Sequence, residues 1–266
     1  MQILKDLFSL ENKTALITGA AEGLGRQFAL TLAEVGANLI LLDRQQKALE
    51  TVADKARSFG HTVEILCLDL IHSQDIQETM EKVRQEHAPI DILVNNAAVG
   101  GANPIESTTF HQALQHYQEY SEINFRAPWL LSHMVAQQMM QHKIAGSIIN
   151  IASACGDRSP GKFNAIYSAT KAALIQMTRS MALELASKKI RVNAILPGLI
   201  NTPMAQDMIN SKNFDFEDVI PLGFIALPED LKATLLLLAS NKASAYITGS
   251  LITIDGGASI SSLFRK

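Results

Sequence analysis

From Lys13 onward the sequence alternates short apolar runs with longer amphipathic stretches. The apolar runs end in Gly, Asp or Asn, and several amphipathic stretches begin near Ser, Asp or Pro, as helices do. This alternation is typical of βαβ units around a parallel sheet whose strands are buried on both faces. It predicts an α/β, doubly wound Rossmann fold, in which residues 1–266 form a single domain with a seven-stranded parallel sheet and helices on both faces.

Two of the expected helices are longer than the rest. They cover residues 110–141, with a kink at Pro128, and residues 164–186, and Ala, Met and Leu occur on most of their faces. The expected strands cover residues 14–18, 38–43, 62–68, 90–94, 146–151, 190–195 and 251–254. Further helices are expected at residues 24–35, 45–59, 73–87 and 228–239.

The charge balance and the cysteine count exclude several classes of function. A net charge of −3 supplies no basic field for nucleic acid or anionic lipid. The apolar runs are far shorter than the ~18 residues that a membrane span needs, and residues 1–13 lack a signal-peptide core. Cys67, Cys155 and the scattered histidines show no metal-ligand spacing. We expect a cytoplasmic protein with no metal, no nucleic-acid partner and no membrane partner.

A glycine-rich turn follows the first expected strand. Gly19, Gly23 and Gly25 stand between that strand and a helix, where backbone N–H groups can bind a pyrophosphate. Gly19 would permit the tight turn, Gly23 the approach of the backbone to the phosphates, and Gly25 close packing of the helix on the sheet. Because ordinary turn chemistry would also use three glycines, this motif alone leaves both interpretations open.

An acidic residue at the end of the second expected strand bears on the choice of cofactor. Asp43 lies 18 residues after Gly25, where a dinucleotide-binding fold places an acid on the adenosine ribose 2′-hydroxyl. The carboxylates of Asp43 and Glu22 would repel a 2′-phosphate, which favours NAD over NADP. Arg44 could reach a 2′-phosphate, so NADP is the less favoured alternative, and Asp43 could also serve as a helix N-cap.

A tyrosine and a lysine form the candidate catalytic pair. Tyr167 and Lys171 are four residues apart on an expected helix, which puts their Cβ atoms about 5 to 6 Å apart on one face. In isolation, the pair would be better explained as an exposed Tyr beside a Lys, but Ser153 ends a buried strand just upstream. A tyrosine with a pKa near ~10 needs a nearby cation to act as a base at neutral pH. We expect the charge of Lys171 to outweigh burial and to lower the pKa of Tyr167.

A set of short motifs runs through nearly the whole chain in a fixed order. It consists of Thr18-Gly19-x-x-x-Gly23-x-Gly25, Asp69-Leu70, Asn95-Asn96-Ala97-Ala98, Asn124, Ser153, Tyr167-x-x-x-Lys171, Pro197-Gly198 and Asp255-Gly256-Gly257. In this order the set resembles the short-chain dehydrogenase/reductase family. The resemblance implies an oxidoreductase in which a bound nicotinamide cofactor exchanges a hydride with the substrate.

The resemblance implies a role for each of four catalytic residues. Ser153 would hydrogen-bond the substrate oxygen, and Tyr167 would be the acid/base. Lys171 would tune Tyr167 and hold the nicotinamide ribose, while Asn124 would anchor a water in a proton relay.

The resemblance also implies the cofactor contacts. Asp69 would meet the adenine ring, Asn95 and Ala97 the ribose side, and Ile200 and Thr202 the carboxamide. Asp69 could instead cap the next helix, and Asn95 with Asn96 could satisfy backbone groups at the end of the fourth strand. The expected contacts are Gly19, Gly23, Leu24, Gly25, Asp43, Asp69, Leu70, Asn95, Ala97, Tyr167, Lys171, Pro197, Gly198, Ile200 and Thr202.

Two positions depart from the family pattern. Ala98 stands where the pattern has a glycine, and the gap from Ser153 to Tyr167 is one residue longer than usual. Either change would narrow the pocket. Cys155 is expected to be a packed thiol near that pocket, and the irregular residues 201–227 are expected to form a substrate lid.

The predicted function is NAD(H)-dependent interconversion of an alcohol and a carbonyl. Residues 6–13 resemble the start of sugar-acid dehydrogenases such as gluconate 5-dehydrogenase and 2-deoxygluconate 3-dehydrogenase, which implies a sugar acid or a polyol as substrate. Arg158 and Lys162 could pair with a carboxylate, or they could be surface charges. The alternatives are a 3-oxoacyl-thioester (acyl carrier protein) reductase, which usually prefers NADPH, and a non-catalytic NAD-binding module.

The expected assembly is a homotetramer or a homodimer. The long apolar helices and residues 248–257 resemble the segments with which the family assembles.

Overall fold

The computed structural model describes residues 2–158, 165–211, 215–217 and 219–261. Within them, seven strands form one parallel sheet in the order β3-β2-β1-β4-β5-β6-β7, which confirms the predicted fold class. The strands are β1 (Thr14–Thr18), β2 (Asn38–Asp43), β3 (Val63–Cys67), β4 (Ile92–Asn95), β5 (Ser147–Ile151), β6 (Arg191–Pro197) and β7 (Leu251–Ile254). Each lies within two residues of its predicted bounds, because apolar runs closed by turn residues mark strands well.

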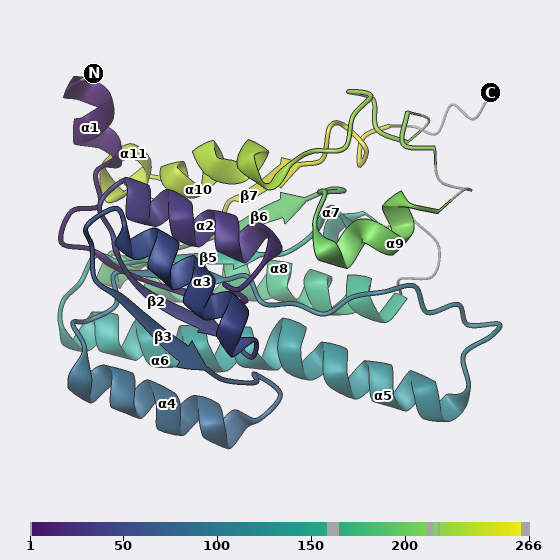
Figure 1. The fold of residues 1–266 in the computed structure, drawn as a ribbon, viewed down its shortest axis with the longest axis horizontal. Helices are drawn as coiled ribbons and strands as arrows, with labels where there is room; N and C mark the ends of the chain where they lie inside the picture. Colours follow the sequence, from purple (N-terminus) through teal and green to yellow (C-terminus); the bar gives the residue numbers. More distant parts are fainter. Residues whose placement is uncertain (1, 159–164, 212–214, 218, 262–266) are drawn as a thin grey trace.

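Helices cover both faces of the sheet and enclose a separate apolar core on each side (Figure 1). Phe28 and Leu235 belong to the core under α2, α3 and α10, and Leu131 and Leu174 to the core under α4, α6 and α8. All four side chains are buried because they occupy the sheet-facing side of their helices. The bounds are α2 (Gly23–Glu34), α3 (Gln46–Arg57), α4 (Ser73–Glu86), α6 (Ala127–Gln141), α8 (Ala165–Leu185) and α10 (Lys232–Ala239).

Several short elements complete the described part of the chain. The N-terminal helix α1 (Gln2–Phe8) is joined to the start of α11 (Asn241–Ser244) by a hydrogen bond from the Ser240 hydroxyl to the Leu7 carbonyl. No helix within the described residues has the length and apolarity that a membrane crossing requires. The other elements are α5 (Phe110–Ser121), α7 (Ala154–Asp157), α9 (Gln206–Ile209) and the 3-10 turns at Ala186–Lys188, Pro203–Ala205 and Pro228–Leu231.

The long helix predicted over residues 110–141 is interrupted, but not by a kink at Pro128. A π-helical turn at Glu122–Arg126 separates α5 from α6, and the Ala127 N–H donates to the carbonyl of Glu122, five residues earlier. Pro128 lies in the first turn of α6, where the missing N–H of a proline is tolerated. The predicted position of the break was therefore wrong by a few residues. Such π-turns are often found at functional sites, and this one contains Asn124.

The strand order indicates where a ligand would bind, at the carboxyl ends of the strands between β1 and β4. β1 lies between β2 and β4, so the chain leaves β1 toward one face of the sheet and leaves β4 toward the other. Ligands of open α/β sheets bind beyond the carboxyl ends of the strands at such a reversal. In Figure 1 these ends point to the right, where α7, α9 and the loop before α5 lie.

Candidate active site

The turn after β1 has a backbone that requires glycine. Gly19 and Gly23 have φ angles of +63° and +53°, a region that side chains disfavour. A Cβ on Gly19 would lie 2.8 Å from the Cα of Ala97, and one on Gly25 would overlap the carbonyl oxygen of Gly19. Gly25 therefore packs the start of α2 against the turn itself. The three glycines together leave a cradle that any side chain would fill.

The first turn of α2 presents free backbone donors to this cradle. Glu22 is the N-cap residue, but its side chain makes no capping hydrogen bond, and the first turn contains no acidic residue. The initial N–H groups of a helix carry partial positive charge, which favours a bound anion. Leu24 is partly buried in this turn, and the Thr202 methyl lies 3.4 Å from where a Cβ of Gly23 would stand. The geometry fits the pyrophosphate of a dinucleotide.

Two polar side chains fix the shape of the turn from neighbouring strands. Asp43 is buried at the end of β2 and accepts from the N–H groups of Ala21 (3.1 Å) and Gln45 (2.9 Å). Asn96 donates to the carbonyls of Thr18 (2.9 Å) and Gly19 (3.1 Å). Each Asp43 oxygen keeps a lone pair for a further donor such as a ribose hydroxyl.

The acidic residue after β3 binds its own loop. Asp69 accepts from the Ile71 N–H at 3.1 Å and lies 3.8 Å from the guanidinium of Arg44. It does not cap α4, whose N-cap residue is His72. The neighbouring Leu70 is buried in the core. The loop is also attached to the π-turn, because Arg126 donates to the Ile71 carbonyl at 2.7 Å.

The side chains of the neighbouring residues Asn95 and Asn96 point to different parts of the molecule. The side chain of Asn95 is 2% exposed and donates to Ser132 and Asn150, both at 2.8 Å, so it is directed into the core. Ala97 is partly buried beside the glycine turn, where its N–H donates to the Thr18 hydroxyl at 3.0 Å.

Ser153, Tyr167 and Lys171 come together where β5 ends and α8 begins. The Ser153 side chain is near enough to the Tyr167 hydroxyl to lower its pKa, and it accepts from the Cys155 N–H at 3.2 Å. The Lys171 ammonium lies 5.7 Å from the centre of the Tyr167 ring and donates to the Ile151 carbonyl at 2.8 Å. Lys171 is 2% exposed and Ser153 is 6% exposed, so both groups face the site with little water around them.

Burial, and not charge, dominates the protonation of this pair. Desolvation raises the pKa of Tyr167 to about 12, although the hydrogen bond from Ser153 opposes the shift. Desolvation also lowers the pKa of Lys171 to about 8. The expectation that the charge of Lys171 outweighs burial and lowers the pKa of Tyr167 was therefore wrong for this chain, because desolvation is the largest effect on the phenol.

The side chain of Asn124 links the loop after β4 to α8 by hydrogen bonds. Its carboxamide accepts from the Val99 N–H (2.8 Å) and donates to the Val99 carbonyl (2.9 Å) and to Thr170 (3.2 Å). Thr170 in turn donates to the Tyr167 carbonyl at 2.8 Å. Because Pro128 has no N–H, the Asn124 carbonyl lacks the donor that a regular α-helix would give it.

The segment after β6 connects the site to the expected lid. The Gly198 N–H donates to the Ile254 carbonyl at 2.8 Å, so Pro197 and Gly198 lie beside the end of β7. Ile200 pairs with Ala226 in an isolated parallel bridge. The two ends of the segment 201–227 therefore meet, and parts of that segment lie outside the described residues.

Three residues that the sequence did not single out lie in the neighbourhood of Tyr167. A Cβ on Gly100 would stand 3.2 Å from the Tyr167 ring and 3.6 Å from the Met204 sulfur. Tyr120 is 5% exposed and raises the pKa of Tyr167 by electrostatic interaction, as does the expected neighbour Cys155. Tyr120 lies one helical turn before Asn124, and that spacing was the only signal for it.

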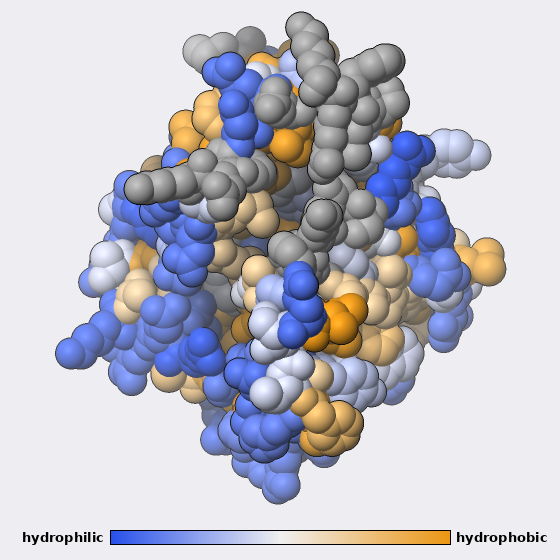
Figure 2. All heavy atoms as spheres, turned by 90° about the vertical axis from the view of Figure 1, so that its right-hand side faces the viewer, coloured by the Kyte–Doolittle hydropathy of each residue, from blue (hydrophilic) through white to orange (hydrophobic). Residues whose placement is uncertain are grey.

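Of Arg158 and Lys162, the two cations predicted to pair with a substrate carboxylate, the structure describes only the first. Arg158 is exposed and donates to the Ser259 carbonyl at 3.2 Å, and Lys162 lies outside the described residues. The described residues contain no cluster of His, Cys, Asp and Glu that could hold a metal ion. Figure 2 shows the face beyond the carboxyl ends of the strands, where apolar and hydrophilic side chains are mixed.

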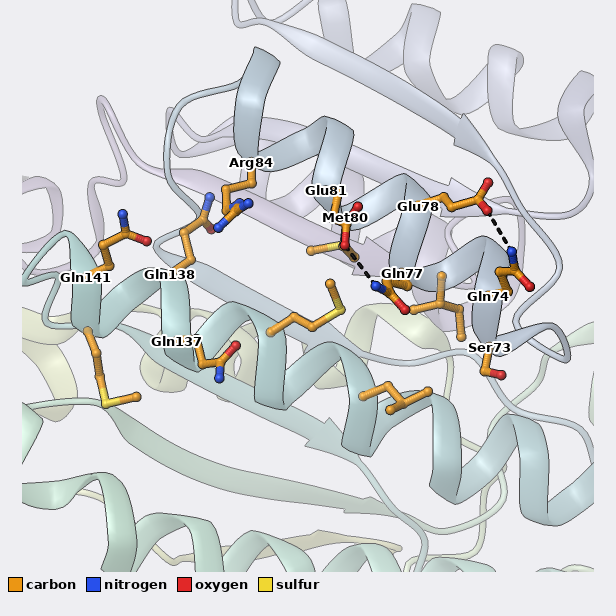
Figure 3. Close-up of a pocket in the computed structure, with 14 residues that line it drawn as sticks. Ser73, Gln74, Gln77, Glu78, Met80, Glu81, Arg84, Gln137, Gln138 and Gln141 are labelled. Atoms are coloured by element: carbon orange, nitrogen blue, oxygen red, sulfur yellow. Dashed lines mark hydrogen bonds between the residues drawn. The ribbon is translucent and has the colours of Figure 1, made fainter.

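A groove lies between α4 and α6 (Figure 3). Among the residues that line it, glutamines and glutamates pair along α4, Gln74 with Glu78 at 3.0 Å and Gln77 with Glu81 at 2.9 Å. None of the expected site residues lines it.

Comparison with known proteins decides the family. A family model described as "Enoyl-(Acyl carrier protein) reductase" matches residues 19–259. The chain is 35% identical to a 3-oxoacyl-[acyl-carrier-protein] reductase from Thermotoga maritima over 93% of this chain and 98% of that protein. It is 34% identical to an L-xylulose reductase from Cavia porcellus over 93% and 97% of the two chains.

The chain belongs to the short-chain dehydrogenase/reductase family. It is an NAD(P)-dependent oxidoreductase that acts on CH–OH groups. Among solved structures of the family, a gluconate 5-dehydrogenase from Burkholderia cenocepacia, in complex with NADP and tartrate, superimposes with a TM-score of 0.89. It is 26% identical and covers 97% of this chain and 99% of its own.

Proposed function

We propose that this short-chain dehydrogenase/reductase interconverts an alcohol and a carbonyl with NAD(H), on a small sugar acid or polyol. The observation that carries the proposal is the convergence of the Ser153 and Tyr167 hydroxyls beside the buried Lys171. Two hydroxyls at one point can hold a single substrate oxygen between them. The glycine cradle on α2 lies at the carboxyl end of the same sheet and supplies the dinucleotide site.

The proton steps of the proposed reaction are assigned to Tyr167, Ser153 and Lys171. A bound nicotinamide would exchange a hydride with the substrate carbon. With a pKa raised to about 12, Tyr167 is protonated at neutral pH and donates to the oxygen of a carbonyl substrate. Ser153 hydrogen-bonds the same oxygen, and Lys171 compensates the negative charge left on Tyr167. The backbone oxygen of Asn124 would hold the water that returns a proton to Lys171.

The preference for NAD rests on charges around the adenosine ribose. Asp43 is fixed at the end of β2 by two backbone donors, and Glu22 adds a second carboxylate in the glycine turn. Arg44 lies near Asp69, which leaves it less available for a 2′-phosphate. The related gluconate 5-dehydrogenase holds NADP in its crystal, so this preference needs its own test. Asp43→Ala should lower the ratio of NAD to NADP efficiency about 100-fold; higher efficiency with NADP in the unaltered protein would refute the preference.

Tyr167→Phe tests the enzymatic role directly. The variant should lose about 10³-fold in turnover on a panel of sugar acids, polyols, steroids and acyl thioesters, while NADH binding measured by fluorescence stays unchanged. Equal activity would refute the assignment. Exclusive NADPH-linked thioester reduction would favour an acyl-thioester reductase, and NADH binding without turnover on any substrate would favour a binding module.

We also propose assembly as a homodimer or homotetramer in the cytoplasm. Phe125, Trp129 and Met140 are 37%, 42% and 38% exposed along one stripe of the π-turn and α6, and Leu183 on α8 is 84% exposed. Apolar stripes of this kind are typical of interfaces between subunits. The exposed free thiol of Cys67 suits a reducing compartment. Light scattering should report two or four copies, and Trp129→Glu should shift the mass toward that of one chain.

A further inference from the structure

A tyrosine and an asparagine form a polar pair beside the catalytic hydroxyls. Tyr120, on α5, accepts a hydrogen bond from the Asn103 carboxamide at 3.0 Å. Asn103 ends the loop that starts at Val99, and its carboxamide also donates to the Gly101 carbonyl at 3.2 Å. Tyr120 is 5% exposed, so its hydroxyl is held in place and shielded from bulk water.

This pair lies close to the reacting groups. The loop between Val99 and Asn103 passes directly beside the Tyr167 ring, since a Cβ on Gly100 would stand 3.2 Å from it. The start of the loop is bound by Asn124 and its end by Tyr120, both on one continuous helical segment. The Tyr120 hydroxyl lies 3.4 Å from where a Cβ of Gly101, the residue after Gly100, would stand, and Tyr120 raises the pKa of Tyr167 by electrostatic interaction.

Tyr120 and Asn103 together offer a ligand one hydrogen-bond donor and one hydrogen-bond acceptor. Tyr120 accepts from Asn103, and within the described residues its own O–H proton has no recorded acceptor. Both amide hydrogens of Asn103 are used, and its carbonyl oxygen has no recorded donor there. A hydroxyl group both donates and accepts, so it can satisfy both atoms at once. A carboxylate only accepts and would leave the Asn103 oxygen facing a negative charge.

We propose that Tyr120 and Asn103 bind a second, uncharged hydroxyl of the substrate next to the reacting carbon. They therefore select a substrate that carries a hydroxyl, and not a carboxylate, on the carbon next to the reacting one. This inference rests on the proposed function, because it assumes that Ser153 and Tyr167 hold the reacting oxygen. It is also consistent with the placement of Arg158, whose guanidinium is exposed and donates to the Ser259 carbonyl.

Three matched compounds test the effect of the second hydroxyl by itself. They are cyclohexanol, 1,2-cyclohexanediol and 2-hydroxycyclohexanecarboxylate, which differ only in the group beside the alcohol. The protein should bind and oxidise the diol about tenfold better than cyclohexanol, and the carboxylate worst. Tyr120→Phe should remove that tenfold advantage, mainly through KM for the diol, and should change the kinetics with cyclohexanol much less.

Tyr117→Phe is the matched control, because Tyr117 lies on the same helix but is 58% exposed. It should leave all three probes unchanged. An equal loss on diol and cyclohexanol in Tyr120→Phe would mean that Tyr120 only supports the fold, and a retained advantage would mean that it does not touch the substrate. Either result would overturn the inference, as would an unaltered protein that does not distinguish the diol.

Calorimetry with the NADH-saturated protein repeats the comparison without turnover. Tenfold tighter binding of the diol, lost in Tyr120→Phe, together with no oxidation of any probe, would refute the proposed enzymatic function alone. Oxidation of cyclohexanol with no preference for the diol would refute the Tyr120–Asn103 inference alone.

Discussion

The two halves of the site are held in different ways. Around the glycine turn, the polar side chains of Asp43 and Asn96 are each bonded to two backbone groups of the surrounding loops. Around Tyr167, the side chains are buried next to one another, and their pKa values are displaced from the ordinary range. The first half is a rigid backbone shape, and the second is a set of groups poised to exchange a proton.

This difference predicts two kinds of response to mutation. A change in the cofactor half should act on binding and stability together, because the backbone itself forms the site. A change in the catalytic half should act on rate and pH dependence with little effect on cofactor affinity. The variants below test that division.

Gly25→Ala should have the largest effect. Its Cβ would overlap the Gly19 carbonyl, a backbone atom that cannot move without opening the turn. We expect a loss of about 3 kcal/mol in the free energy of unfolding, and loss of NADH binding. Urea titration and NADH fluorescence measure the two quantities. Gly60→Ala is the control, because a Cβ on Gly60 would have nothing within 4 Å; its positive φ (+92°) alone should cost only about 1 kcal/mol.

Substitutions of the two neighbouring asparagines should affect different quantities, NADH affinity for Asn96 and the free energy of unfolding for Asn95. Asn96→Ala removes both hydrogen bonds to the glycine turn, so NADH affinity should fall about tenfold. Asn95→Ala removes the donor to the Ser132 hydroxyl and to the Asn150 side-chain oxygen in the core, so it should lower the free energy of unfolding by about 2 kcal/mol. NADH affinity should change less than about twofold in Asn95→Ala. A similar loss of affinity in both variants would contradict the distinct places of the two side chains.

Gly100→Ala should have the smallest effect and act on rate alone. The new methyl would press on the Tyr167 ring at 3.2 Å, a distance at which the ring must shift by a few tenths of an ångström. We expect turnover to fall roughly fivefold, about 1 kcal/mol in the barrier, with NADH affinity unchanged. Steady-state kinetics beside NADH fluorescence would check this, and weaker NADH binding would argue against the division into two halves.

Much of the fold could be predicted because its signals are local. The strands are apolar runs closed by Gly, Asp or Asn, and the sheet buries them on both faces. The π-turn at Glu122–Arg126 could not be located, since one extra residue in a helical turn leaves no compositional mark. Pro128 indicated an irregularity, but proline also suits the first turn of a new helix.

The sequence predicted which residues form the candidate site better than it predicted the directions of their side chains and their pKa values. The sequence could not tell which of Asn95 and Asn96 faces the glycine turn, because adjacent side chains at a strand end point in opposite directions. It also could not give the pKa of Tyr167, since burial and charge act in opposite directions and only coordinates weigh them. Tyr120 escaped notice because a tyrosine in an amphipathic helix is usually structural.

The pH dependence of the two reaction directions tests the central claim that Tyr167 carries the proton. Burial raises the pKa of Tyr167 to about 12 and lowers that of Lys171 to about 8. Reduction needs protonated Tyr167 and cationic Lys171, so its rate should be level from about pH 6 to 8 and fall above 8. Oxidation needs ionised Tyr167, so its rate should rise about tenfold per pH unit across the same interval. Oxidation that is level from about pH 6 to 8 would contradict the account.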